Sequence, residues 1–215
     1  VGNYYHAKSV FIYLEILNDL PNREYLSGIA EILKCGLIKK NKILNLLQNN
    51  INKILNRNPI LIKKLIYETL NTKIYFFKDD INENNKRLFL NFGHTFAHSI
   101  EMATEKLFKK EVLRHGEAVG IGILCEIMIS NMRKNKLFLL SEKILKNYNL
   151  PTNLNYYNHD VDKQKLVDEI YRGVFLDKKK INKYPRFISL KKIYNPKIKE
   201  IEDTGKILEV IKLII

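Results

Sequence analysis

Apolar residues recur at helical spacing along most of this chain, and that periodicity restricts its fold more than any other feature. Between residues 24 and 39 one helical face carries Leu26, Ile29, Ala30, Leu33 and Leu37. The same spacing predicts further helices over 41–56, 60–77, 93–106, 118–133, 141–146 and 205–215. The sequence therefore predicts a mainly α protein.

Two segments depart from this helical pattern and are predicted to be short strands. Residues 8–17 read KSVFIYLEIL and are rich in β-branched and aromatic side chains, and residues 186–190 read RFISL. The polar stretch 79–86 is expected to be a loop, and a long surface connection is expected after Pro151. Because no internal repeat or clean linker is present, we expect one domain over residues 1–215.

Composition adds limits on location and partners. The chain has 215 residues, 46% of them hydrophobic, and its two cysteines form no CxxC pair, which favours buried free thiols in a reducing cytoplasm. No apolar run approaches the roughly 18 residues of a membrane span. The formal net charge of +14 could attract nucleic acid, an acidic membrane or an anionic metabolite, but the lysines are scattered instead of forming one stripe. Since the chain begins with Val1, we expect it to be a piece of something longer.

Histidines are few, and three of the five lie close together in sequence. His94 and His98 are four residues apart, so both imidazoles leave one face of a helix, and His115 arrives from a second segment. This arrangement suits a bound divalent metal. The alternative is a set of core histidines that are hydrogen-bonded to the backbone.

A catalytic metal commonly takes two histidines and one carboxylate, because this set leaves a position for water or substrate. Glu31 lies on an otherwise apolar helical face, where an uncompensated carboxylate is costly to bury. Glu101 and Glu117 are rivals because they are nearer to the histidines in sequence. Glu31 also has a simpler explanation, since Lys34 lies one turn away and could be its salt-bridge partner.

Three sequence blocks resemble the signature blocks of 3-dehydroquinate synthase, in the same order and at similar separations. They read LPNREYLSGIAEILKCGLI, RLFLNFGHTFAHSIE and RHGEAVGIGI. The resemblance covers the whole chain but only the C-terminal half of the family. It implies a multi-helical metal- and substrate-binding domain with a few short β-strands.

The resemblance also implies roles for individual residues. Glu31, His94 and His115 would bind a divalent metal, zinc or cobalt, and His98 would relay protons near the substrate. The basic substrate cage would consist of Lys34, Lys73, Arg87, Asn91 and one of Lys178 and Lys179. Each cage residue could instead be ordinary surface charge, but convergent cations suit a substrate with a phosphate and a carboxylate.

The implied reaction converts 3-deoxy-arabino-heptulosonate 7-phosphate into 3-dehydroquinate with loss of phosphate, in the shikimate pathway. The glycine-rich strand–turn–helix that would hold NAD is absent from this sequence, so the redox step needs an N-terminal NAD-binding half. At most the segment Ile16, Leu17, Asn18 and Asp19 would touch NAD. The family also tends to form homodimers. The alternatives are a related sugar phosphate cyclase, a basic module that binds nucleic acid, and a non-catalytic remnant.

Overall fold

The computed structural model describes residues 5, 7–130, 135–155, 157, 161–176 and 184–215. Helices dominate it, as the apolar periodicity predicted. In chain order the helices are α1 (Ile16–Asp19), α2 (Asn22–Ile38), α3 (Ile43–Asn49), α4 (Ile51–Leu55), α5 (Pro59–Phe77), the 3-10 helix η1 (Lys86–Asn91), α6 (His94–Phe108), α7 (His115–Ser130), α8 (Lys136–Asn147), α9 (Lys163–Leu176) and α10 (Thr204–Ile214). Two strands, β1 (Arg186–Leu190) and β2 (Pro196–Glu200), form an antiparallel hairpin.

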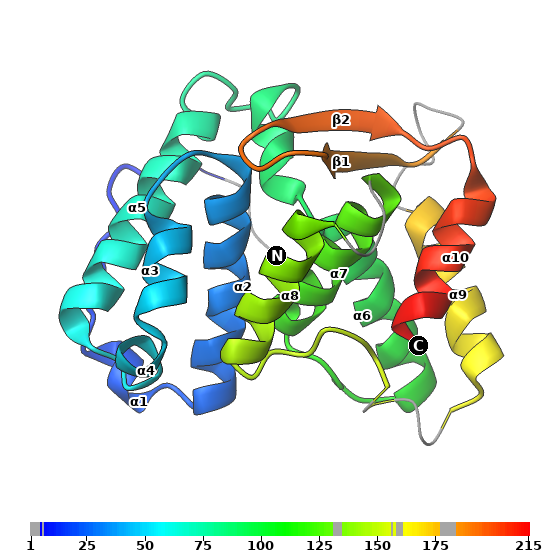
Figure 1. Cartoon of the computed structure of the whole chain (residues 1–215), viewed down its shortest axis with the longest axis horizontal. Coiled ribbons are helices and arrows are strands. Elements are labelled where there is room, and N and C mark those ends of the chain that lie inside the picture. The colour runs from blue at the N-terminus through cyan, green and yellow to red at the C-terminus, as the bar shows by residue number, and fades with distance from the viewer. Residues whose placement is uncertain (1–4, 6, 131–134, 156, 158–160, 177–183) are drawn as a thin grey trace.

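Helix α7 is the centre of the domain. Its residues from Gly116 to Ile129 are all buried, and all of them except Glu117 and Glu126 are apolar or glycine, so this helix is buried on every face. Helices α2 and α6 pack directly against it, and α9 packs on α6. Figure 1 shows α1 to α5 on one side of this centre, α9 and α10 on the other, and the hairpin lying across the top.

Two glycines allow neighbouring chain segments to approach α7 closely. A Cβ at Gly116 would lie 1.9 Å from the backbone oxygen of Ser27 in α2, and a Cβ at Gly122 would lie 2.0 Å from the backbone oxygen of Gly93. Gly93 has a φ of +86° and directly precedes α6. A side chain at Gly116 would therefore push α2 away from α7, and a side chain at Gly122 would push the start of α6 away from α7.

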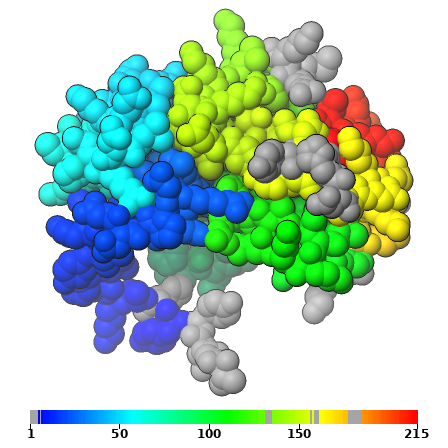
Figure 2. Space-filling view, turned by 90° about the horizontal axis from the view of Figure 1, so that it is seen from below, coloured from blue at the N-terminus to red at the C-terminus, as the bar shows by residue number. Residues whose placement is uncertain are grey.

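The prediction of a strand over residues 8–17 is wrong. Its described residues up to Leu14 form no helix or strand, and Ile16–Asp19 form the short helix α1. A strand needs a hydrogen-bonded neighbour, and β1 and β2 pair only with each other among the described residues. Val10, Phe11 and Tyr13 are left more than half exposed, and Figure 2 shows this dark-blue segment projecting from the outside of the molecule.

Other differences are smaller. The predicted helix over 41–56 is interrupted at Asn50, which separates α3 from α4. The surface connection predicted after Pro151 contains helix α9, whose apolar face packs on α6, and β2 was not predicted. The strand at 186–190 is confirmed as β1, and both cysteines are buried free thiols as predicted. No helix in the described part of the chain is both long and apolar enough to cross a membrane.

Candidate metal centre and adjoining cavity

Three helices bring Glu31, His94 and His115 together. Glu31 lies on the third turn of α2, while His94 and His115 are the first residues of α6 and α7. The close approaches at Gly116 and Gly93 place both helix starts beside α2 and α7. One ligand atom from each of the three residues lies within 4.8 Å of the others.

The orientation of these side chains suits a shared cation. Nε2 of His94 lies 3.5 Å from Oε1 of Glu31, and the ring centroids of His94 and His115 are 5.3 Å apart. Two imidazoles and a carboxylate are a common donor set for catalytic zinc. The residues present therefore fit a divalent metal.

Electrostatics favour the metal-binding protonation states of His94 and Glu31, but not that of His115. Burial, followed by the nearby charge of Lys34, lowers the pKa of His94 to about 4, so its imidazole is neutral at physiological pH. Burial alone would raise the pKa of Glu31, but Lys34, His94 and Lys73 outweigh it and hold that pKa below its usual value. A hydrogen bond with Glu101 raises the pKa of His115 despite partial burial.

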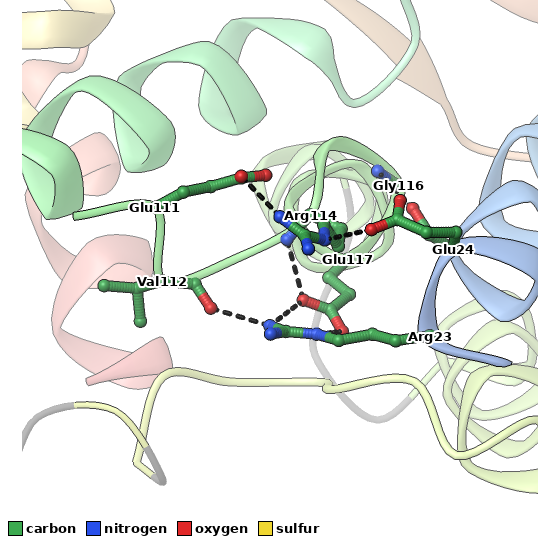
Figure 3. A network of polar contacts seen from close by, with 8 residues as sticks. Arg23, Glu24, Glu111, Val112, Arg114, Gly116 and Glu117 are labelled. Atoms are coloured by element: carbon green, nitrogen blue, oxygen red, sulfur yellow. Dashed lines mark hydrogen bonds and ion pairs between the residues drawn. The ribbon is translucent and has the colours of Figure 1, made fainter. Parts of the chain in front are cut away.

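The competing carboxylate Glu117 is occupied elsewhere. It accepts hydrogen bonds from Nε and Nη2 of Arg23, at 2.7 and 2.6 Å, and from the backbone N–H of Arg114 at 2.8 Å. Figure 3 shows this pair of Arg23 and Glu117 joining the start of α2 to the start of α7. In the same network, the guanidinium of Arg114 forms ion pairs with Glu24 and Glu111. Glu117 therefore clamps together two of the helices that carry the candidate ligands.

The other rival, Glu101, lies beside His115. Its Oε1 is 3.0 Å from Nδ1 of His115. His98, Glu101 and His115 form a second group whose ligand atoms lie within 4.8 Å of one another. His94 and His98 do not belong to one such group of three in the described part of the chain, although their ring centroids are 5.4 Å apart.

A cavity of about 300 Å³ adjoins the histidines. Its lining includes Asn91, His94 and His98, together with Glu83 and Arg186. Neither Glu83 nor Arg186 is among the site residues predicted from the sequence. Glu83 lies in a polar loop and Arg186 begins a strand, so neither carries a motif of its own, and only their position on the cavity wall draws attention to them.

The predicted cage cations lie around two carboxylates. Nζ of Lys34 is 2.9 Å and Nζ of Lys73 is 3.9 Å from Oε2 of Glu31, so the simple ion pair of Glu31 and Lys34 is also present. Nε of Arg87 is 3.7 Å from Glu83, whose other oxygen accepts from Asn91 at 2.5 Å. Lys178 and Lys179 lie outside the described residues.

Asp80 shapes the loop that presents Arg87 and Asn91. Its carboxylate accepts backbone hydrogen bonds from Asn84, Asn85 and Arg87 at 2.8 to 2.9 Å. Burial would raise the pKa of Asp80, but these donors outweigh it and lower the pKa. The polar stretch predicted as a loop is therefore ordered around one carboxylate.

The predicted NAD-contact segment lies in a different place from the histidines. Arg57 donates to the backbone oxygens of Leu17, Asn18 and Leu20 and so holds this segment against the start of α5. The cavity beside it has a volume of about 310 Å³ and shares no lining residue with the histidine cavity. Contact between the segment Ile16–Asp19 and NAD therefore stays a prediction.

The sequence of this chain matches a known protein family. The model of the 3-dehydroquinate synthase C-terminal family matches residues 28–180. The chain belongs to this family. A 3-dehydroquinate synthase from Dictyoglomus thermophilum is 34% identical over 212 residues, covering 99% of this chain and 57% of the relative. One from Campylobacter hominis is 35% identical over 192 residues, covering 87% of this chain and 51% of the relative.

Solved structures of related enzymes share the family fold. A 2-deoxy-scyllo-inosose synthase superposes with a TM-score of 0.76 at 23% identity, over 98% of this chain and 56% of that one. A 2-epi-5-epi-valiolone synthase from Streptomyces hygroscopicus, solved with NAD+ and Zn2+ bound, gives a TM-score of 0.73 at 18% identity, over 94% of this chain and 54% of that one. The chain thus spans about half the length of these relatives. The predicted multi-helical fold of the family is confirmed.

Proposed function

We propose that this chain is the metal- and substrate-binding part of a 3-dehydroquinate synthase, active when joined to an NAD-binding half. The observation that carries the proposal is the convergence of Glu31, His94 and His115 beside a cavity lined by Asn91 and His98. The family membership and the curated relatives of that name support the same reaction. The reaction is the conversion of 3-deoxy-arabino-heptulosonate 7-phosphate into 3-dehydroquinate and phosphate.

In this proposal Glu31, His94 and His115 hold the divalent metal. When bound, zinc or cobalt polarises a substrate oxygen as a Lewis acid, and NAD in the other half supplies the redox chemistry. The low pKa of His94 keeps a lone pair available on its Nε2. The low pKa of Glu31 keeps its carboxylate charged.

The remaining residues bind the substrate and move protons. Lys34, Lys73, Arg87 and Asn91, with Lys178 or Lys179, hold the phosphate and carboxylate groups in one productive conformer. Once substrate enters, its anionic groups replace Glu83 as the partner of Arg87. His98 lies on the cavity wall and accepts or returns protons at its ring nitrogens.

A related sugar phosphate cyclase is the second candidate, because the similar solved structures are a 2-epi-5-epi-valiolone synthase and a 2-deoxy-scyllo-inosose synthase. Both candidates need a metal, so the substrate distinguishes them. A 3-dehydroquinate synthase requires cations for a carboxylate as well as for a phosphate. The joined enzyme should therefore accept the seven-carbon sugar acid phosphate and reject a neutral sugar phosphate of similar size.

The segment Ile16–Asp19 would border NAD, and the joined protein would be a cytoplasmic homodimer without a nucleic-acid or membrane partner. Sedimentation of the joined protein measures the oligomeric state. Steeply salt-dependent binding to duplex DNA, unaffected by zinc, would instead favour a basic binding module.

Zinc content tests the metal centre directly. The variants Glu31→Ala, His94→Ala and His115→Ala should each lose most of the zinc that the purified chain retains after dialysis, whereas His98→Ala should keep it. Each of the first three removes one of only three protein ligands. Equal loss from all four variants would contradict this assignment and favour His94 and His98 as joint ligands.

A further inference from the structure

The two candidate ligand groups share one residue, His115. One group consists of Glu31, His94 and His115, and the other of His98, Glu101 and His115. A neutral imidazole has one lone-pair nitrogen, so His115 can serve only one group at a time. Its tautomer therefore decides which group holds a metal.

The contact between Glu101 and His115 indicates the tautomer. Oε1 of Glu101 is 3.0 Å from Nδ1 of His115. A carboxylate only accepts hydrogen bonds, so the proton of the neutral ring is on Nδ1 and the lone pair is on Nε2. In this state His115 has no lone pair on the nitrogen that faces Glu101.

His94 is arranged in the same way by a different partner. Its Nδ1 lies 3.4 Å from the backbone oxygen of Phe92, while its Nε2 faces Glu31 at 3.5 Å. Both histidines thus direct Nδ1 at an oxygen acceptor and keep Nε2 for a metal. Histidines that bind metals generally donate their second nitrogen to a carboxylate or a carbonyl in this manner.

We propose that Glu101 is a positioning residue for the metal centre: it holds His115 as the Nδ1–H tautomer, so that Nε2 joins Glu31 and His94. This inference rests on the proposed metal centre and adds a residue that is not itself a ligand. Glu101 lies on α6 two turns after His94, and His115 begins α7, so their contact also fixes the ring across the gap between the two helices.

The affinity for zinc tests this inference. In competition with a chromophoric chelator, Glu101→Ala should bind zinc about 10- to 100-fold more weakly than the unmodified chain, the usual effect of losing such a partner. Glu101→Gln should lose less, because its amide oxygen still accepts from Nδ1–H. Glu105→Gln is the matched control, since Glu105 is exposed one turn further along α6 and should not alter the affinity.

Two spectroscopic measurements separate positioning from general destabilisation. In the metal-free chain at alkaline pH, ¹⁵N spectra of the imidazoles should show the Nδ1–H form of His115, and Glu101→Ala should shift it toward Nε2–H. With Co²⁺, the visible d–d spectrum should change in Glu101→Ala while Glu105→Gln keeps the spectrum of the unmodified chain. Thermal melts of the metal-free variants report any loss of folding.

The possible results are distinct. If the unmodified chain binds zinc and Glu101→Ala leaves affinity and tautomer unchanged, the positioning role is overturned while the metal centre stands. If Glu101→Ala abolishes binding as completely as Glu31→Ala, Glu101 is a ligand and the inference is also wrong. If the unmodified chain binds no zinc, both the metal centre and this inference fail.

Discussion

At the scale of single residues, the candidate site consists of cationic side chains that lie beside carboxylates. The cationic side chains suit an anionic substrate, and the carboxylate of Glu31 suits a metal cation. Lys34 and Lys73 both approach Glu31, and Arg87 approaches Glu83. The side chain of Lys34 is only 3% exposed, so a buried ammonium is held beside the candidate metal ligand. Such a group is stable only with a permanent counter-charge, which Glu31 provides.

Lys73→Ala and Arg87→Ala should weaken binding of a phosphonate analogue of the substrate without lowering the zinc content. A hydrogen bond to a charged group is worth about 1.5–3 kcal/mol, so each change should weaken binding about 10-fold or more. Calorimetric titration of the zinc-loaded protein measures this. Lys53→Ala removes an exposed lysine from α4 and is the control. An unchanged affinity in the two variants would identify Lys73 and Arg87 as ordinary surface charge.

At the scale of elements, the close contact of α2 with α7 decides whether the ligands meet. Arg23 and Glu117 join the helix starts, and Gly116 lets the backbones touch, with its N–H donating to Oγ of Ser27 at 3.0 Å. The HGE sequence thus supplies a candidate metal ligand, a close backbone approach and a buried carboxylate that pairs with Arg23, in three consecutive residues. This explains why Glu117, although nearest to His115 in sequence, points away from the metal centre.

Gly116→Ala should destabilise the domain and weaken zinc binding together. The added Cβ would lie 1.9 Å from the backbone oxygen of Ser27, so α7 must shift, at a cost of about 1–3 kcal/mol or more. Gly28→Ala is the matched control, because nothing lies within 4 Å of its Cβ position in the same helix pair. It should stabilise α2 by about 0.5–1 kcal/mol. Thermal melts and chelator competition would measure both effects, and a neutral Gly116→Ala would show that the contact is not needed.

At the scale of the whole molecule, one continuous apolar core runs from α2 and α3 through α7 to α9 and α10. Some apolar side chains are not part of this core. Ile12 of the N-terminal segment and Ile60, Tyr67 and Leu70 of α5 line an open groove of about 640 Å³. This surface lies outside the shared core. The described helices should consequently unfold together.

We expect a single cooperative thermal transition for residues 1–215. Far-ultraviolet and near-ultraviolet circular dichroism should give the same midpoint, because helices and buried tyrosines share one core. Tyr25 and Tyr148 are both buried and donate to backbone oxygens of α4 and α3, which links their signals to that core. Two separated transitions would instead divide the chain into more than one domain.

Periodicity and motif spacing were sufficient to predict most of the long helices, the short strand at 186–190 and the family, because these depend on local apolar patterns and on residue order. They missed α1 and α9. Local pattern also favoured a strand at 8–17, but a strand depends on a partner elsewhere, and none lies in the described part of the chain. Sequence spacing could not choose among Glu31, Glu101 and Glu117. Only the packing of α2, α6 and α7 shows where each of them lies: Glu31 is beside His94 and His115, Glu101 is beside Nδ1 of His115, and Glu117 is paired with Arg23.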